Sequence, residues 1–287
     1  MSKQAAIVVL YFNKERLTVR CVRSILASGY EPHRVYCFDN GSKPEVFAGI
    51  RDTFPLVNHG RSEENSGYAG GFNRALAWVF CGPFSSALFC TNDTLVLPGA
   101  LEECQKTAAR TGAGLVAPRI TYLLKQEEID SIGAYFDEEA CTIRHYRVHD
   151  LPDLLIPGQD YIPGTAWWID RAAFQALGGA DESYFTYWED VDLSFRAHRQ
   201  NIKLARCYPA LIRHGVGQTC HKKPLYTTFY FQRNRIRFCK RFLAGERLKR
   251  SLAIIGRELE ELGQRWQKQD DRQRLAYLKE IQAELVR

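Results

Sequence analysis

The segment YWEDVDLSFR, at 187–196, contains three carboxylates that could do acid–base chemistry. On a helix, Glu189 and Asp192 lie three residues apart and share a face, whereas Asp190 points elsewhere. Clustered carboxylates beside aromatic residues repel one another and cost free energy when they are desolvated. A catalytic site would justify that cost. An ordinary solvated helix start would explain the acids as well, because acids in a first turn complement the helix dipole.

Two further aspartates directly follow predicted strands. Asp39 ends the strand RVYCFD, and its carboxylate could accept the N3–H of uracil or thymine, which cytosine and the purines do not offer equivalently. Asp93 follows the strand SALFCT and could hold Mg²⁺ or Mn²⁺ against a diphosphate, because such ions complete their shells from phosphate and water. Taken singly, Asp39 also fits a turn, and Asp93 also fits a turn or a helix cap.

A glycine-rich segment and a histidine add two more candidates. In NSGYAGGFNRA, at 65–75, Gly70 and Gly71 allow close backbone approach, and the start of the following helix favours a phosphate. The segment is neither a P-loop nor the G-x-G-x-x-G fingerprint of dinucleotide binders, and Asn65 adds a neutral hydrogen-bonding group. His214 follows another strand-like run, although a lone histidine is more often a surface or core residue than a metal ligand.

The elements that must position these residues alternate between strand and helix in the first third of the chain. The predicted strands are AAIVVLY, RVYCFD, SALFCT and GLVAPRI, and the helices include 14–28 and GFNRALAWVF. This order indicates βαβ units and a mainly parallel sheet, whose ligands bind at the carboxyl ends of the strands. Asp39 and Asp93 stand at two such ends and predict a nucleotide pocket. Paired acids could also serve a glycoside hydrolase, but a hydrolase needs no nucleotide pocket.

The later part of the chain has a different pattern. Residues 120–161 are short, polar and irregular runs, which predict hairpins or a mobile loop. From Leu248 to Trp266, apolar residues recur in steps of four and three, the pattern of an amphipathic helix. We therefore expect one domain at 1–243 and a C-terminal helical extension at 244–287. The extension would either pack on the body or form a homodimer.

Composition and charge narrow the class of protein. With 287 residues, 45% of them hydrophobic, the chain can bury a large core, and no apolar run approaches the ~20 residues that span a bilayer. Nine cysteines without CxxC pairs favour reduced thiols in the cytosol. The net charge of +6 is uneven, because the aromatic-rich segment 220–250 has ten basic residues and one acid. This basic segment predicts contact with an anionic surface, and a solvated helix is the alternative.

In this order, the blocks resemble those of inverting family 2 glycosyltransferases, and most of all those of bacterial rhamnosyltransferase-like members. The resemblance covers about 5–240 and rests on VVLYFN, FDNGS, NSGYAGGFNRA, CTNDT, PGTAWWIDRAAFQALGGADESYF and YWEDVDLSFR. YTTFYFQRNRIRF is similar to the segment that these enzymes carry after the catalytic domain. The resemblance implies a GT-A fold, that is, a Rossmann-like, mainly parallel mixed sheet flanked by helices, together with Mn²⁺ or Mg²⁺ as cofactor.

The resemblance also implies a role for each candidate residue. Asp190 matches the catalytic base. Asp93 matches the last aspartate of the metal-binding DxD motif and His214 a downstream metal ligand, while Thr91 stands where a first acid is often found. The residues implied for nucleotide-sugar binding are Tyr11, Asn13, Asp39, Asn65, Gly70, Gly71 and Asn92. Those implied for acceptor binding are Trp167, Trp168, Trp188 and Glu189.

The function so implied is transfer of a sugar, with dTDP-rhamnose as the first donor, to a hydroxyl of a glycan or lipid-linked saccharide in cell-surface polysaccharide synthesis. A UDP-hexose (galactose, glucose or galactofuranose) transferase of the same fold is the first alternative. A degenerate protein that binds nucleic acid or lipid is the second. We expect a cytoplasmic protein on the inner face of the membrane, held there by its basic segment, with no nucleic-acid partner.

Overall fold

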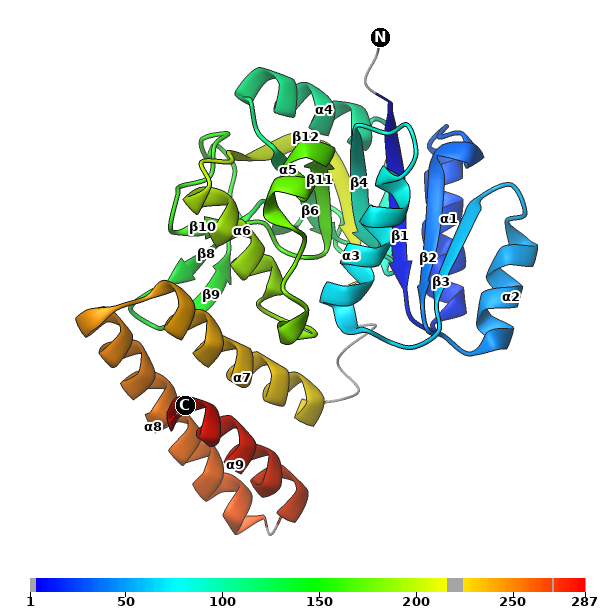
Figure 1. The fold of residues 1–287 in the computed structure, drawn as a ribbon. Helices are drawn as coiled ribbons and strands as arrows, with labels where there is room; N and C mark the ends of the chain where they lie inside the picture. Colours follow the sequence, from blue (N-terminus) through cyan, green and yellow to red (C-terminus); the bar gives the residue numbers. More distant parts are fainter. Residues whose placement is uncertain (1–3, 216–223, 270, 287) are drawn as a thin grey trace.

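A computed structural model describes residues 4–215, 224–269 and 271–286. A central sheet flanked by helices is joined to a small second sheet and to three long C-terminal helices (Figure 1). The described part of the chain includes no helix with both the length and the apolar composition that crossing a membrane requires.

The central sheet has nine strands, eight of them in the order β3-β2-β1-β4-β11-β6-β12-β5, with β7 paired to β6. Neighbouring strands are parallel except where β11, β5 and β7 pair with their neighbours, so the sheet is mixed and mainly parallel, as predicted. Its strands are β1 (Ala5–Tyr11), β2 (Val35–Asn40), β3 (Asn58–Ser62), β4 (Ser86–Thr91), β5 (Thr94–Val96), β6 (Leu115–Tyr122), β7 (Ile129–Ser131), β11 (Ala166–Asp170) and β12 (Leu204–His214).

The register of the sheet brings the candidate residues to one edge. Tyr11 pairs with Asp39 at the ends of β1 and β2, so both residues lie at the carboxyl edge of the parallel strands. His214, the last residue of β12, pairs with Thr94 of β5, directly after Asp93. Residues far apart in the sequence therefore meet at the edge where parallel sheets bind their ligands.

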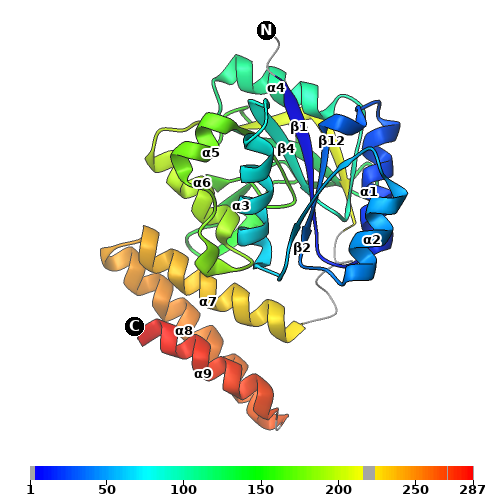
Figure 2. The same cartoon turned by 45° about the vertical axis from the view of Figure 1, so that its right-hand side comes forward.

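Helices cover both faces of this sheet (Figure 2). Alternate residues of β1 enter two separate cores, as expected for a strand buried on both sides: Ile7 and Val9 face one, Ala6 and Val8 the other. The first core includes side chains of α1 (Glu15–Ala27), α2 (Pro44–Thr53) and α4 (Ala100–Thr111). The second includes side chains of α3 (Gly67–Phe80), α5 (Arg171–Leu177) and α6 (Glu189–Arg199). Two short 3₁₀ helices, η1 (Pro32–Arg34) and η2 (Glu182–Tyr184), complete this part.

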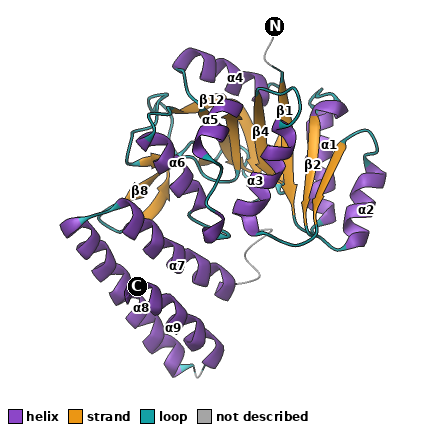
Figure 3. Cartoon of the chain, viewed as in Figure 1, coloured by secondary structure: helices purple, strands orange, loops and turns teal. Residues whose placement is uncertain are grey.

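The irregular stretch after β6 forms the hairpins that the sequence predicted. Its strands β8 (Ala134–Asp137), β9 (Thr142–His145) and β10 (Asp160–Tyr161) make a three-stranded antiparallel sheet (Figure 3). Arg206 of β12 anchors it, because its Nη2 lies 2.5 Å from Oδ2 of Asp160 and both side chains are buried. A buried guanidinium of this kind needs several acceptors, and Arg206 also donates to the carbonyls of Ile132, Pro152 and Leu154.

The C-terminal helices α7 (Pro224–Phe242), α8 (Gly245–Lys268) and α9 (Arg272–Val286) pack on the body through a third core. This core joins Trp188 and Val191 to Phe238 of α7, Leu259 of α8 and Ile281 of α9. The apolar stripe of α8 therefore packs against other parts of the same chain. This is packing on the body, one of the two arrangements that the sequence allowed. A homodimer through the C-terminal helices stays a prediction.

The basic segment at 220–250 is mostly used inside the protein. Arg235 pairs with Glu258, Arg237 with Glu284 and Arg241 with Asp181 and Asp192. These contacts link α7 to the helical extension and to the body. The three arginines are therefore already paired with acids, which weakens the attraction to an anionic membrane that we expected from them. Residues 220–223 of the segment lie outside the described residues.

Candidate active site

Asp39 provides a buried carboxylate at the end of β2. Its Oδ1 accepts a hydrogen bond of 2.9 Å from the backbone N–H of Ser42. Its Oδ2 makes no hydrogen bond within the described residues, although Nε of Arg61 lies 3.2 Å away. Burial raises the pKa of Asp39, against the lowering effect of Ser42 and Arg61. An unsatisfied buried acceptor is costly, so this oxygen fits a ligand N–H such as that of a pyrimidine base.

Tyr11 and Asn13 lie beside Asp39 but face different surroundings. The Tyr11 ring is buried in the first core, and its hydroxyl has no hydrogen-bond partner among the described residues. Asn13 links two loops, since its N–H donates to Oγ of Ser42 at 2.6 Å and its Oδ1 accepts from the N–H of Lys43. Both residues therefore shape the loop around the Asp39 carboxylate.

The glycine-rich segment has a structural use that differs from the expected one. Asn65 Oδ1 accepts from the N–H of Gly67 and from Nδ2 of Asn40, so it fixes the loop between β3 and α3. A Cβ on Gly71 would lie 2.8 Å from Leu10, and one on Gly70 would also meet side chains, so these glycines let α3 pack closely. Two of the first amides of α3 already have acceptors, since Asn65 accepts from Gly67 and Phe185 from Ala69, and phosphate binding at this helix start stays a prediction.

Asn92 and the three candidate tryptophans also lie in the protein interior. Asn92 donates from Nδ2 to Oγ1 of Thr18 on α1 at 2.9 Å, which uses the amide we had assigned to the donor. Trp167 and Trp168 alternate along β11 and enter opposite cores, while Trp188 enters the third core. All three rings are buried among core side chains, and their part in acceptor binding stays a prediction.

Asp93 and His214 meet across the ends of β4 and β12, as the sequence predicted. Nε2 of His214 lies 3.6 Å from Oδ2 of Asp93. The Thr91 hydroxyl donates to Oδ1 of Asp93 at 2.7 Å. Thr91 stands where the first acid of the DxD motif is often found, and here it orients the carboxylate of Asp93. A carboxylate and an imidazole at this separation have the donor atoms to share one divalent cation.

Asp130 of β7 completes this group and was missed from the sequence. Its Oδ2 accepts from Nδ1 of His214 at 3.1 Å, which leaves Nε2 facing Asp93. Metal-binding histidines usually donate their other ring nitrogen to a carboxylate in this way. Burial lowers the pKa of His214, but hydrogen bonds to Asp130 and Asp93 outweigh it and raise that pKa to about 9. The described residues alone form no complete metal-binding cluster. A metal held by Asp93 and His214 would therefore need phosphate and water to complete its shell.

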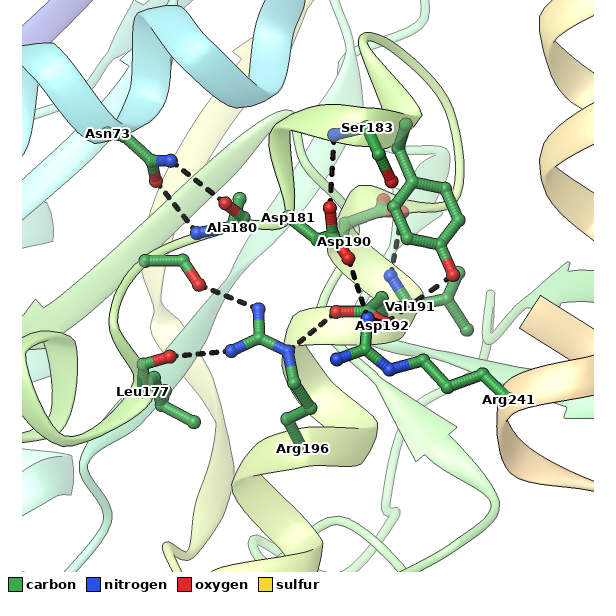
Figure 4. A network of polar contacts seen from close by, with 12 residues as sticks. Asn73, Leu177, Ala180, Asp181, Ser183, Asp190, Val191, Asp192, Arg196 and Arg241 are labelled. Atoms are coloured by element: carbon green, nitrogen blue, oxygen red, sulfur yellow. Dashed lines mark hydrogen bonds and ion pairs between the residues drawn. The ribbon is translucent and has the colours of Figure 1, made fainter. Parts of the chain in front are cut away.

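Asp190 occupies the first turn of α6 and is held by backbone groups (Figure 4). Its Oδ2 accepts from the N–H of Gly164 and its Oδ1 from the N–H of Val191, both at 2.8 Å. The Tyr68 hydroxyl donates to the Gly164 carbonyl and so steadies the same turn. Burial raises the pKa of Asp190 to about 6, against the lowering effect of the two N–H groups. A half-buried carboxylate with this pKa is ionised at neutral pH and still basic enough to accept a proton.

The neighbouring acids differ from Asp190, as the spacing predicted. Asp192 is fully buried, and its Oδ2 lies 2.6 Å from Nε of Arg196, the pairing we had expected four residues on. Its Oδ1 lies 2.8 Å from Nη1 of Arg241 on α7, so Asp192 is structural (Figure 4). Glu189 is buried with Oε2 unbonded, and burial, followed by the charge of Asp190, raises its pKa well above the usual value. Burial therefore disfavours the ionised form of this carboxyl.

Comparison with known families decides what class of site this is. Residues 6–178 match Glycosyl transferase family 2. The chain belongs to this family. A curated relative, the low-salt glycan biosynthesis hexosyltransferase Agl10 of Haloferax volcanii, is 25% identical over 190 residues, which cover 63% of this chain. The chain spans 57% of that protein's length.

Solved structures show the same fold for this family 2 chain. The mannosyltransferase PcManGT of Pyrobaculum calidifontis, in complex with GDP-Man and Mn²⁺, has a TM-score of 0.58 at 13% identity, covering 98% of this chain and 84% of its own. GalNAc-T7 with UDP, GalNAc and Mn²⁺ has a TM-score of 0.59 at 14% identity, covering 74% and 43%. Staphylococcus aureus TarS 1-349 has a TM-score of 0.56 at 11% identity, covering 92% and 72%. The GT-A fold is confirmed.

Proposed function

We propose that this chain is a metal-dependent inverting glycosyltransferase that moves a sugar from a dTDP- or UDP-linked donor to a hydroxyl of a glycan or lipid-linked saccharide. The observation that carries the proposal is the 3.6 Å approach of His214 to Asp93 at the sheet edge that also presents Asp39. Asp39, proposed to bind the nucleotide base, lies near the end of β2, Asp93 follows β4 and His214 ends β12, while Asp190 lies on α6. UDP and GDP-Man, bound in the two Mn²⁺-containing structures, support a nucleotide-sugar donor.

In the proposed reaction, Asp190 accepts the proton of the acceptor hydroxyl as that oxygen attacks the anomeric carbon from the face opposite the diphosphate. The anomeric carbon–oxygen bond to the diphosphate breaks as the new glycosidic bond forms. Asp93 and His214 would hold Mn²⁺ or Mg²⁺, whose positive charge stabilises the departing diphosphate. This single displacement needs no covalent enzyme intermediate and therefore inverts the anomeric centre.

Two donors are proposed in order. The resemblance of the sequence blocks favours dTDP-rhamnose, whereas the hexosyltransferase Agl10 favours a hexose, which places a UDP-hexose second. A degenerate binder is disfavoured, because Asp93 and His214 lie 3.6 Å apart and Asp39 keeps a buried oxygen without a hydrogen bond from the described residues. The test is turnover with each nucleotide sugar plus Mn²⁺ or Mg²⁺. Absence of turnover, together with affinity for oligonucleotides or lipid, would favour the binder.

Asp39 is expected to set the base preference. UDP and dTDP should bind more tightly than CDP or GDP, and Asp39→Ala should weaken UDP binding by about 10–100-fold, since hydrogen bonds to charged groups contribute roughly 1.5–3 kcal/mol. Calorimetric titration of the four diphosphates measures both effects. Asp52→Ala, on the exposed surface of α2, is the matched control and should bind UDP normally. Equal affinity of the native protein for all four bases would contradict the role of Asp39.

Asp130 is expected to control metal affinity through His214. Asp130→Asn removes the negative acceptor that orients the imidazole, and loss of such a partner weakens metal binding by about 10–100-fold. Titration of Mn²⁺ in the presence of UDP, followed by electron paramagnetic resonance, measures this without relying on turnover. Glu128→Gln, on the adjoining turn and paired with Lys125, is the control. Unchanged Mn²⁺ affinity in Asp130→Asn would remove Asp130 from the site.

A further inference from the structure

The loop between η2 and α6 has an unusual backbone. Three residues other than glycine take the left-handed conformation directly before the helix of Asp190: Phe185, Tyr187 and Trp188, with φ of 63°, 66° and 74°. Each such residue costs on the order of 1 kcal/mol or more, so a chain adopts three within four residues only where its surroundings enforce them. The loop must therefore be held from outside.

Asn234 of α7 supplies that hold. Its side chain is fully buried, and Nδ2 donates at 2.8 Å to the carbonyl oxygens of Tyr184, Thr186 and Tyr187. This one side-chain amide therefore contacts three backbone carbonyls of the loop. Its own Oδ1 accepts from Nε of Arg233 at 3.0 Å, which fixes the orientation of the amide.

Neighbouring contacts strengthen the same attachment. Nη2 of Arg233 donates at 3.1 Å to the carbonyls of Ser183 and Tyr184. The ring of Phe185 stacks on Tyr230 of α7, with centroids 5.1 Å apart and planes 22° apart. Figure 1 shows α7 running along this side of the body, although it lies outside the residues that match the family.

The loop also connects the two halves of the site. The Phe185 carbonyl accepts from the N–H of Ala69 in the first turn of α3, while Trp188 precedes Glu189 at the start of α6. Displacing the loop would therefore move Asp190 away from the Gly164 amide that holds it. Asp39, which is proposed to bind the base of the nucleotide sugar, lies on β2, outside this loop, and would stay in place.

We propose that Asn234 is a positioning residue for the transfer reaction: it holds loop 184–188 in its left-handed form and so places Asp190 against the acceptor hydroxyl. The inference rests on the proposed role of Asp190. Asn234 lies away from the proposed donor and acceptor sites, and it is the α7 side chain that contacts the most carbonyls of the loop within the described residues. Its removal should act on the chemical step and leave nucleotide binding unchanged.

The test uses the full chain with Asn234→Ala, and with Asn234→Ser, which keeps one hydroxyl donor. Misplacement of a catalytic group by about 1 Å costs on the order of 10²-fold, so kcat should fall by about that factor in Asn234→Ala and less in Asn234→Ser. The KM for the donor should stay within about twofold. Hydrogen exchange of the 183–190 amides should become faster in both variants.

Arg235→Met is the matched control. Arg235 is the next residue of α7 and is equally buried, but its guanidinium donates to Ala140, Cys141 and Glu258 instead of the loop. This variant should lose thermal stability with kcat and 183–190 exchange unchanged. Equal kcat losses in the Asn234 and Arg235 variants, or native exchange of 183–190 in Asn234→Ala, would overturn the proposal. Full turnover of Asp190→Asn alongside faster 183–190 exchange in Asn234→Ala would instead refute the role of Asp190.

Discussion

Replacement of Asp190 by Asn is expected to lower turnover by roughly 10²–10⁴-fold while donor binding stays close to native, the range that positioned proton transfer contributes. Asn keeps the shape of the side chain, and its one oxygen can accept from either Gly164 or Val191, so the loss would report the missing base together with one lost backbone contact. Single-turnover assays with saturating donor, and calorimetric titration of the nucleotide diphosphate, separate the two quantities. Native turnover in Asp190→Asn would exclude Asp190 as the base.

The pH profile provides an independent measurement of the same group. A general base works when deprotonated, and the pKa of Asp190 is about 6, so kcat should fall as pH drops through 6 and level off above it. Asp190→Asn should lack this acidic limb. A native profile that is flat between pH 5 and 7 would contradict the assignment.

The two neighbouring acids are the controls for Asp190. Glu189→Gln replaces the buried carboxyl with an amide of the same size and should mainly change the KM for the acceptor. Asp192→Asn breaks the contacts to Arg196 and Arg241 and should act through stability. Equal and mild losses of turnover in all three variants would indicate that the segment is an ordinary solvated helix start.

Asp93→Ala is expected to lower turnover by on the order of 10²–10³-fold and to abolish the dependence of UDP binding on Mn²⁺. The metal contributes several kcal/mol of charge stabilisation to a departing diphosphate, and each 1.36 kcal/mol corresponds to tenfold in rate. His214→Ala should act in the same direction and less severely. Turnover and UDP affinity measured across a Mn²⁺ titration give both effects.

The control for Asp93 is Asp137→Asn in the β8–β9 hairpin, a carboxylate paired with Arg144 and without contact to the sheet edge. It should titrate with Mn²⁺ as the native protein does. If the native enzyme keeps full activity in excess EDTA, or if Asp93→Ala does so, the metal assignment fails at both ligands.

Much of this arrangement follows from local pattern. Apolar runs bounded by polar residues predict β1, β2 and β4, and the rule that parallel strands share a carboxyl edge predicts that Asp39 and Asp93 lie on it. Likewise, helix α5 begins after Asp170, whose carboxylate caps Ala172, and ends at Gly178 in the left-handed conformation. Signals of this kind lie within a few residues of what they determine.

The parts that were missed depend on partners distant in sequence. Asp130 lies in a segment without regular period, and only the pairing of β7 with β6 brings it to His214, 84 residues later. Trp167 and Trp168 look like an aromatic surface until β11 is placed in the middle of the sheet, where both of its faces are covered. Asn234 offers no local signal at all, because its three acceptors belong to another element.

The third core has a consequence for recombining enzymes of this kind. The side chains that α6 turns toward Phe238 must fit those of α7, while the strands that carry Asp39 and Asp93 belong to the separate first two cores. A chimera joined near residue 178 would keep α6 and α7 from one parent, but it would divide the first two cores, to which α6 and β12 also contribute, and would take Asp93 and His214 from different parents. A junction between α6 and α7 would instead combine the α6 and Asp190 of one parent with the α7 of the other. Their side chains would not fit in the third core, and we expect the hybrid to unfold at this interface.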